Sequence, residues 1–284
     1  MPVYVGLDIG GTKFMVAAAD AQGRILRRLR SASSPNLEQD LATLDRMIAE
    51  VAGDEKIMGM GAAIGGPLDW ETGVVSPLHQ PAWSAVPLKA RMEERWNCPF
   101  YVDVDTNIAA LGEFHFGQVA AHSFLYLTLS TGMGGGLLVN GKIFRGARGA
   151  HPEAGHQSIP YRCAYPERIQ CECGLLDCLE ALISGNGIRR AYGKPAEELN
   201  PAEWAEVAYN LGQGLRNLAV ILAPDVIRLG GGVAVGGGAP FVENARSVMQ
   251  QHLRLVPAPE VQLSQLGYDT ALLGAIAVAI HGLE

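Results

Sequence analysis

The chain has 284 residues, of which 48% are hydrophobic and 18% charged, a composition typical of globular proteins and not of disordered, collagen-like or coiled-coil chains. Twenty-two Lys and Arg residues against 29 Asp and Glu give a net charge of −7, which argues against a nucleic-acid or anionic-membrane partner. The N-terminus lacks a signal-peptide pattern, and no apolar run is long enough to span a bilayer. We therefore expect a cytoplasmic protein of about two domains.

Two strand–turn–strand units predict an α/β protein with two related halves. The first unit has a buried strand at 3–9, a glycine turn and a strand at 14–19. The second has a strand at 124–129, a glycine turn over 130–136 and a strand at 137–139. Each unit is followed by a Gly-(Arg/Lys)-Ile sequence, so the second repeats the pattern of the first.

Helices and strands alternate in the rest of the chain. The spacing of apolar residues predicts helices over 37–51, 88–96, 106–117, 201–222, 241–253 and 270–281, and strands over 57–64, 100–104 and 225–229. No linker separates the halves, so we place a hinge near 112–117. The predicted domains are 1–115, completed by the C-terminal helix 270–284, and 116–269.

The first glycine turn offers groups that bind phosphate. Asp8 ends a buried strand, and Gly10, Gly11, Thr12 and Lys13 follow with unhindered backbone N–H groups, a hydroxyl and a cation. Phosphate and Mg²⁺ prefer such groups. The alternative is an ordinary hairpin turn with a solvated Lys. The turn is not a P-loop, because it lacks the Walker A spacing and a following helix.

Two further glycine turns favour the phosphate interpretation. Ser130, Thr131 and Gly132 begin the second turn, and a third glycine run at 230–232 closes a strand before a helix. Two hairpins that face each other clamp one polyphosphate, and the third run is placed to bind the base and ribose of a nucleotide.

A candidate general base follows the strand at 100–104. Asp105 stands beside Thr106 and Asn107, and a strand-terminal carboxylate over a cleft accepts a hydroxyl proton. The alternative is that Asp105 or Thr106 caps the next helix, a common role that contributes about 1 kcal/mol. Asp103 is the competing acid.

Three of the five cysteines, Cys171, Cys173 and Cys178, lie within eight residues. In a reducing compartment such a cluster indicates a metal site and not a disulfide. A tetrahedral Zn²⁺ needs a fourth ligand, and His156 is the nearest upstream imidazole that completes a Cys₃His structural site. The alternatives are free reduced thiols or a different imidazole such as His151.

Two acids flank this cysteine cluster. Glu153 lies three residues before the candidate histidine ligand, and Glu180 follows the last cysteine by two positions. Glu180 therefore lies within reach of a ligand bound beside the metal loop. Cys98 and Cys163 stand apart from the cluster, and we expect both to be bystanders.

Six segments, taken in order, resemble the ROK family of sugar kinases and sugar-responsive repressors: DIGGTK, DTN followed by AALGE, STGMGGG, PEAGH, CECGLLDCLE and LGGGVA. The resemblance covers nearly the whole chain, and the cysteine cluster behind the Gly-His pair is its most specific mark. It implies an actin-like, ribonuclease H-like α/β fold of two domains with a cleft between duplicated halves.

The resemblance also implies an ATP:hexose phosphotransferase with ATP, Mg²⁺ and a structural Zn²⁺, in which Asp105 is the base. The implied sugar-binding residues are Gly66, Asn107, Glu153, His156 and Glu180. The implied phosphate, magnesium and nucleotide contacts are Asp8, Gly10, Gly11, Thr12, Lys13, Thr131, Gly132, Gly134, Gly231 and Gly232. The implied zinc ligands are His156, Cys171, Cys173 and Cys178.

Homodimers are frequent in the ROK family, and we expect one here. Repressor members carry a helix-turn-helix domain ahead of the first glycine motif, whereas seven residues precede Asp8. The retained Asp105 favours an enzyme over the remaining alternative, a noncatalytic sugar sensor or scaffold.

The acceptor sugar stays open between fructose, glucose, mannose and other hexoses. Val104 stands where many glucose- and N-acetylmannosamine-type members have an Asn before the base. The segments 80–83, 151–153 and 192–195 resemble the fructokinase branch. The compact cysteine cluster does not, because we expect that branch to place a second His there.

Overall fold

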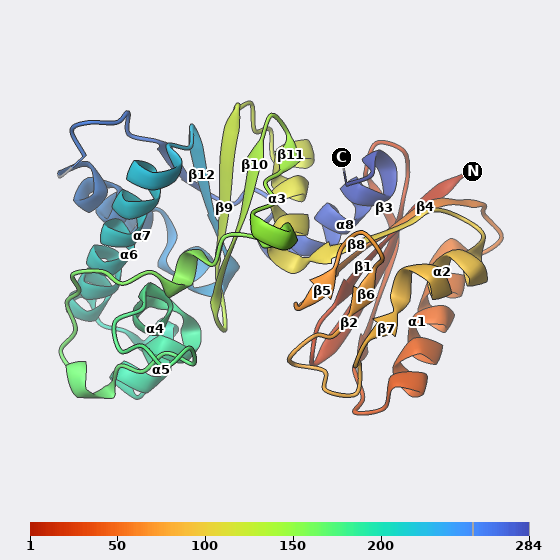
Figure 1. Ribbon diagram of the computed structural model, residues 1–284, viewed down its shortest axis with the longest axis horizontal. Helices are drawn as coiled ribbons and strands as arrows, with labels where there is room; N and C mark the ends of the chain where they lie inside the picture. Colours follow the sequence, from red (N-terminus) through yellow and green to blue (C-terminus); the bar gives the residue numbers. More distant parts are fainter. Residues whose placement is uncertain (252, 284) are drawn as a thin grey trace. The chain divides into compact units, whose positions relative to one another are not determined.

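The computed structural model describes residues 1–251 and 253–283, which form two compact units (Figure 1). Unit 1 comprises Met1–Val119, Arg145–Ala150 and the C-terminal segment from Asp269, and unit 2 comprises Ala120–Phe144 and His151–Tyr268. Residues 252 and 284, where predicted helices extend, lie outside the described residues. Across the described residues, no helix has both the length and the apolar character needed to cross a membrane.

Unit 1 contains a five-stranded sheet with the strand order β3-β2-β1-β4-β8. Its strands are β1 (Val3–Ile9), β2 (Lys13–Ala19), β3 (Ile25–Ala32), β4 (Ile57–Ile64) and β8 (Phe100–Val104). The first three form an antiparallel meander, and β4 and β8 run parallel to β1. A small sheet that the sequence did not predict follows β4, with strands β5 (Leu68–Asp69), β6 (Val74–Val75) and β7 (Val86–Pro87).

The helices of unit 1 are α1 (Leu37–Ala52), α2 (Leu88–Trp96), α3 (Asp105–Phe116) and α8 (Thr270–His281). Side chains alternate along a strand, so Val5 and Leu7 point into the core that α1 and α2 complete. Gly6, between them, points to α8, because a Cβ on Gly6 would lie 2.7 Å from Ile276 Cγ1. The sheet of unit 1 is thus covered on both faces.

The predicted hinge near 112–117 lies inside this packing. A Cβ on Gly112 would lie 2.7 Å from the backbone nitrogen of Gly274, so α3 and α8 approach each other at backbone distance. The boundary of unit 1 falls later, after Val119. Residues 145–150, which the sequence analysis places in the second domain, belong to unit 1, because Arg145 pairs with Asp103 there.

Unit 2 contains a second five-stranded sheet with the order β11-β10-β9-β12-β13. Its strands are β9 (Ser123–Leu129), β10 (Met133–Val139), β11 (Lys142–Ile143), β12 (Val226–Gly230) and β13 (Glu260–Leu263). As in unit 1, the first three are antiparallel and the last two run parallel to the first. The internal repeat predicted from the sequence is therefore confirmed.

The helices of unit 2 are α4 (Leu179–Ile183), α5 (Gly185–Tyr192), α6 (Pro201–Leu222) and α7 (Gly231–Gln251). The sequence did not predict α4 and α5. It placed the start of α7 at residue 241, which is ten residues too late, because the helix begins inside the glycine run and has a kink at Gly238 (φ 63°, ψ −163°) before Pro240. The second glycine turn is also shorter than predicted, since β10 already begins at Met133.

Candidate active site

The junction between β8 and α3 separates the two candidate acids. Asp103 lies within β8, is 2% exposed and forms an ion pair with Arg145 at 2.6 Å. Asp105 is the first residue of α3 and is exposed. The N-cap is Val104, and no side chain caps this helix terminus, so the interpretation of Asp105 or Thr106 as the cap is wrong. Of the two acids, Asp105 is the one that a substrate hydroxyl can reach.

Three predicted site segments leave the sheet of unit 1 at one edge. Ile64 pairs with Ile9 of β1 and with Val104 of β8, so the three parallel strands end in one row. The first glycine turn, Gly66 and Asp105 follow these strand ends directly. In open α/β sheets, ligands bind at this carboxyl edge.

The pKa of Asp8, the next-to-last residue of β1, depends on the charge of Asp105. Burial is the main cause that raises the pKa of Asp8 to about 6; the negative charge of Asp105 raises it further, and Lys13 opposes both. Two carboxylates interact in this way when they lie near each other. The first glycine turn and the candidate base therefore belong to one electrostatic site.

The first glycine turn is closed by a hydrogen bond from the Gly10 N–H to the Lys13 carbonyl oxygen at 3.0 Å. A Cβ on Gly11 would lie 2.9 Å from His79 Cβ, so this position does not accept a larger residue without movement. Thr12 and Lys13 are exposed. The turn thus presents a hydroxyl and an amine to solvent, as the phosphate interpretation requires.

A hollow of about 580 Å³ lies beside this turn, within unit 1. Gln80 in its lining is 6% exposed, and its Nε2 has no hydrogen-bond partner. The sequence analysis missed His79 and Ser34 because neither belongs to a recognisable motif. The lining consists of Gly11, Thr12, Ser33, Ser34, Pro35, His79, Gln80, Pro81, Ala82 and Trp83.

In unit 2, the second glycine turn and the start of α7 line one pocket of about 260 Å³. Thr131 and Gly232 contribute to it from the predicted set. A Cβ on Gly231, which has φ 84°, would lie 2.3 Å from the Leu129 carbonyl oxygen, so α7 begins directly against the end of β9. A helix N-terminus attracts anions, and Arg189 in the lining, which the sequence analysis missed, adds a positive charge.

Gly134 lies outside the second turn. It pairs with Thr128 inside β10 and does not line the pocket at the start of α7. The adjacent Gly135 is also part of the strand, where a Cβ would lie 3.1 Å from Leu127 Cδ2. Close packing against β9, and not a ligand, therefore accounts for part of this glycine run.

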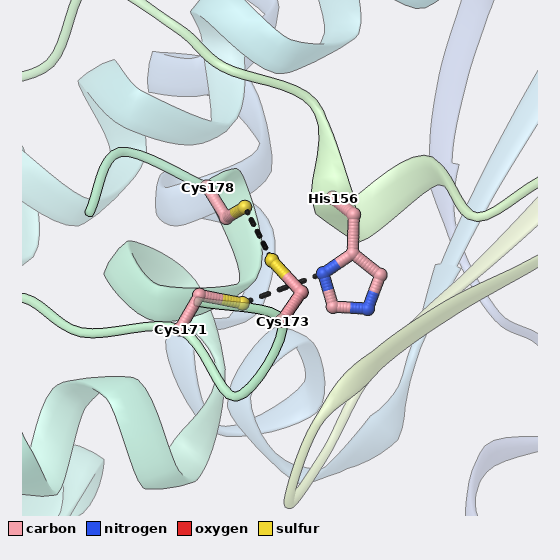
Figure 2. A group of neighbouring side chains, drawn as sticks. All are labelled: His156, Cys171, Cys173 and Cys178. Carbon is pink, nitrogen blue, oxygen red and sulfur yellow. Dashed lines mark hydrogen bonds between the residues drawn. The ribbon is translucent and has the colours of Figure 1, made fainter. Parts of the chain in front are cut away.

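The predicted zinc ligands are brought together, and Figure 2 shows their side chains pointing toward one another. Cys171 Sγ lies 3.4 Å from His156 Nδ1, and Cys173 Sγ lies 3.4 Å from Cys178 Sγ. The four ligand atoms lie within 4.8 Å of one another. Tetrahedral ligands at Zn–S distances of about 2.3 Å are separated by about 3.7 Å, so this donor set fits a structural Zn²⁺.

Short local turns bring these ligands together. The Cys171 N–H donates to the Leu175 carbonyl oxygen, and the Gly174 N–H donates back to the Cys171 carbonyl oxygen, both at 3.0 Å. A hydrogen bond from the Leu175 N–H is the main cause that lowers the pKa of Cys173 to about 7. A thiolate, the form that binds metal, is therefore accessible near neutral pH.

The two acids that flank the cluster have different surroundings. Glu180 Oε2 accepts a hydrogen bond from the Met133 N–H at 2.9 Å, which joins the cluster to the second hairpin. Glu153 is 58% exposed and lies 3.2 Å from His151 Nε2, and the hydrogen bond from His151 is the main cause that lowers its pKa. His151 thus pairs with Glu153 and is not part of the metal cluster.

Comparisons with known proteins agree on one family. The model described as the ROK family matches residues 4–281. The glucokinase of Halalkalibacterium halodurans is 29% identical over 318 residues, covering 95% of this chain and 93% of that protein. The fructokinase of Zymomonas mobilis is 29% identical and covers 98% and 96%. The solved ROK hexokinase from Thermus thermophilus has a TM-score of 0.81 at 32% identity and covers 98% and 97%.

Proposed function

Since this chain belongs to the ROK family, we propose that it transfers the γ-phosphoryl group of ATP to a hydroxyl group of a hexose. The relatives named glucokinase, fructokinase and hexokinase support a sugar kinase. One observation carries the proposal: an exposed carboxylate, Asp105, leaves the sheet of unit 1 at the same edge as the glycine turn at 10–13. A kinase needs a base and a phosphate-binding turn in one site.

In this proposal Asp105 is the general base. It accepts the proton of the acceptor hydroxyl while that oxygen forms a bond to the γ-phosphorus, and the bond from the γ-phosphorus to the bridging oxygen of ADP breaks. Lys13 and the N–H groups of the turn bind the transferred phosphoryl group.

Each unit offers its own candidate contacts for the phosphoryl donor. The turn at Thr131–Gly132 and the α7 N-terminus at Gly231–Gly232 line or adjoin the pocket of unit 2 that suits a nucleotide, with Arg189 as a further cation. Asp8 is the residue that would hold Mg²⁺, and that ion neutralises charge on the phosphates when bound.

The zinc cluster has a structural role in this proposal. His156, Cys171, Cys173 and Cys178 offer four ligand atoms, so a Zn²⁺ ion held by all four would supply rigidity and would leave no position for an attacking water. Glu153, His156 and Glu180 are the sugar contacts that this proposal places in unit 2, and Gly66 is the one that it places in unit 1. Asn107 is 1% exposed and donates to Asp103, so it supports the site from the core and does not contact the sugar.

The acceptor that we propose is a ketohexose, used at least as well as glucose. Val104 precedes the base and is 6% exposed, and its side chain carries no hydrogen-bonding group. Its backbone N–H already donates to Asp103 Oδ1 at 2.6 Å. Position 104 therefore offers no hydrogen bond to the acceptor. A sugar that needs a hydrogen bond there would have a lower kcat/KM.

A coupled assay of ADP release over fructose, glucose, mannose and a blank without sugar tests the proposal. We expect sugar-dependent release that is lost in Asp105→Asn, with fructose at least equal to glucose in kcat/KM. Sugar binding without ADP release would instead support the noncatalytic sensor or scaffold. A glucose kcat/KM well above that of fructose would reject the ketohexose and leave the kinase intact. Light scattering during gel filtration tests the homodimer.

A further inference from the structure

The carboxylate of Asp103 forms hydrogen bonds with residues before and after the candidate base. Its Oδ1 accepts hydrogen bonds from the Val104 backbone N–H at 2.6 Å and from Asn107 Nδ2 at 3.1 Å. Its Oδ2 accepts a hydrogen bond from Arg145 Nη2 at 2.6 Å. Because Val104 precedes Asp105 and Asn107 follows it, one buried carboxylate fixes the chain where the base leaves the sheet.

Arg145 is held on its other side by an aromatic ring. Its guanidinium carbon lies 3.8 Å from the centroid of the Trp70 ring, and the side chain is 17% exposed. Gly149, at φ 80°, lies over the same ring, since a Cβ there would be 3.0 Å from Trp70 Nε1. A planar guanidinium can stack and donate a directed hydrogen bond at once, which an ammonium group cannot.

The side chain of Asn107 depends on this carboxylate for its orientation. Its Oδ1 is buried and has no hydrogen-bond partner, so the bond from Nδ2 to Asp103 sets which way the amide points. The hydrogen bonds of Asp103 are charge-assisted and stronger than neutral ones. A change in the Asp103 rotamer would therefore release Val104 and Asn107 together.

We propose that Arg145 and Asp103 are positioning residues for Asp105. The ion pair holds Asp103 in the rotamer that fixes the junction of β8 and α3, and the fixed junction sets the direction of the Asp105 carboxylate. This inference rests on the proposed role of Asp105 as the base. A displacement of a reacting group by about 1 Å can lower a rate by about 10²-fold, so a small rotation of this junction affects turnover.

Three variants test the pair: Arg145→Met, Asp103→Asn and the double variant. We expect Arg145→Met to lower kcat by about 10- to 100-fold and to leave KM for ATP within about twofold, because the candidate nucleotide pocket lies in unit 2. Since both residues act through one carboxylate, the double variant should lose about as much kcat as one single variant, and not the product of the two losses. Arg145→Lys keeps the charge without the stack and should fall between wild type and Arg145→Met.

Arg95→Met is the matched control. Arg95 also stacks on an indole, Trp96 at 5.3 Å, and also pairs with a carboxylate, Asp45 at 3.9 Å, within unit 1. It is 63% exposed, and its carboxylate partner is Asp45 of α1 and not Asp103. We expect this variant to keep wild-type kcat.

The measurement separates positioning from stability. Each variant is assayed per folded molecule, with its melting temperature measured in parallel. If Arg145→Met alone unfolds because it leaves a buried charge unpaired, the double variant removes both charges and supplies the kcat value. A lower melting temperature with unchanged kcat, or additive losses in the double variant, would overturn the positioning role. Absence of sugar-dependent ADP release in the wild type would instead overturn the proposed function. In that case the positioning role would also fail, because there would be no base to position.

Discussion

The two five-stranded sheets share strand order and strand directions, yet their first hairpins carry different chemistry. Asp8 is the next-to-last residue of β1 and pairs with Met15, whereas Thr128 is the next-to-last residue of β9 and pairs with Gly134. A half-buried carboxylate with a raised pKa in unit 1 therefore corresponds to a neutral hydroxyl in unit 2. The core packing of each sheet sets the topology, and the residues at the strand ends set the chemistry.

The segments inserted into the two sheets also differ in the chemical groups that they carry. Unit 1 inserts a small sheet and α2 between β4 and β8, and unit 2 inserts the cluster of His156, Cys171, Cys173 and Cys178 together with α4 and α5 after β11. The insertion of unit 2 carries Glu153, His156 and Glu180. In the proposed function, proton transfer is therefore a task of unit 1 and cluster-supported sugar binding a task of unit 2.

Loss of the base should give the largest effect. We expect Asp105→Asn to keep the fold and ATP binding and to lower kcat by about 10²- to 10⁴-fold, the range for removal of a general base. Steady-state kinetics and a nucleotide titration measure both. Glu38→Gln is the control, because Glu38 is likewise an acid in the first turn of a helix of unit 1 and has no role in the site. If Asp105→Asn has a kcat near that of wild type, Asp105 is not the general base.

Asp8 should make the stability of unit 1 depend on pH, whereas Thr128 adds no such dependence to unit 2. The pKa of Asp8 is about 6 in the folded chain, whereas the ordinary pKa of an Asp side chain is 3.8. Between these values the folded state binds the proton and the unfolded state does not, so the free energy of unfolding falls as pH rises from about 4 to about 6. At about 1.4 kcal/mol per pKa unit, Asp8→Asn should stabilise the fold at pH 7 by up to about 3 kcal/mol.

Urea unfolding of wild type and Asp8→Asn at pH 4.5 and pH 7 measures this difference. Asp105→Asn provides a second readout, because removal of the neighbouring charge should lower the pKa of Asp8, as carboxyl NMR would detect. An unchanged pKa of Asp8 in that variant would contradict the coupling of the two acids.

Loss of a zinc ligand should affect the sugar and not the nucleotide. We expect one zinc ion per chain by elemental analysis, and we expect Cys171→Ser and Cys178→Ser to lose it and to raise the sugar KM by about tenfold or more. KM for ATP should change less. Cys163→Ser is the control, since Cys163 is a free cysteine outside the cluster. An active wild type without zinc, or an unchanged sugar KM in the cysteine variants, would show that sugar binding does not depend on zinc.

The smallest effect should come from the residue before the base. Val104→Asn places an amide beside Gly66, whose Cβ would lie 3.4 Å from Val104 Cγ1. We expect the ratio of kcat/KM for glucose to that for fructose to rise about three- to tenfold, since one added hydrogen bond contributes about 1 kcal/mol. Val102→Ala in the same strand controls for loss of packing. An unchanged ratio would mean that position 104 does not select the acceptor.

The sequence predicts best where a local pattern encodes the structure. The apolar run Val3–Ile9, the repeated hairpins and the cysteine spacing each correspond to an observed strand, sheet or cluster. The start of α7 could not be predicted, because glycine disfavours helix and tertiary packing overrides that preference at 231–237. Strands β5 to β7 have two residues each, which is too short for periodicity to appear.

Other features of the site could not be predicted because they depend on contacts between residues far apart in the sequence. Arg145 and Asp103 are 42 residues apart, and neither lies in a motif that predicts the other. The choice between Asp103 and Asp105 depended on this contact, because the ion pair buries one acid and leaves the other exposed. The electrostatic coupling of Asp8 to Asp105 likewise arises only when β1 and β8 end at one edge.

Helix α8 covers the strands that the ribosome makes first. It packs against β1, β2 and β4 (Figure 1), and a Cβ on Gly61 of β4 would lie 2.1 Å from the Ala275 carbonyl oxygen. One face of the sheet in unit 1 therefore stays open until residues 270–281 have been synthesised. Unit 2 ends at Tyr268 and has its whole core available earlier. Unit 1 therefore cannot complete its packing until unit 2 has been synthesised, and during that interval the part of its sheet that α8 covers is a surface open to aggregation.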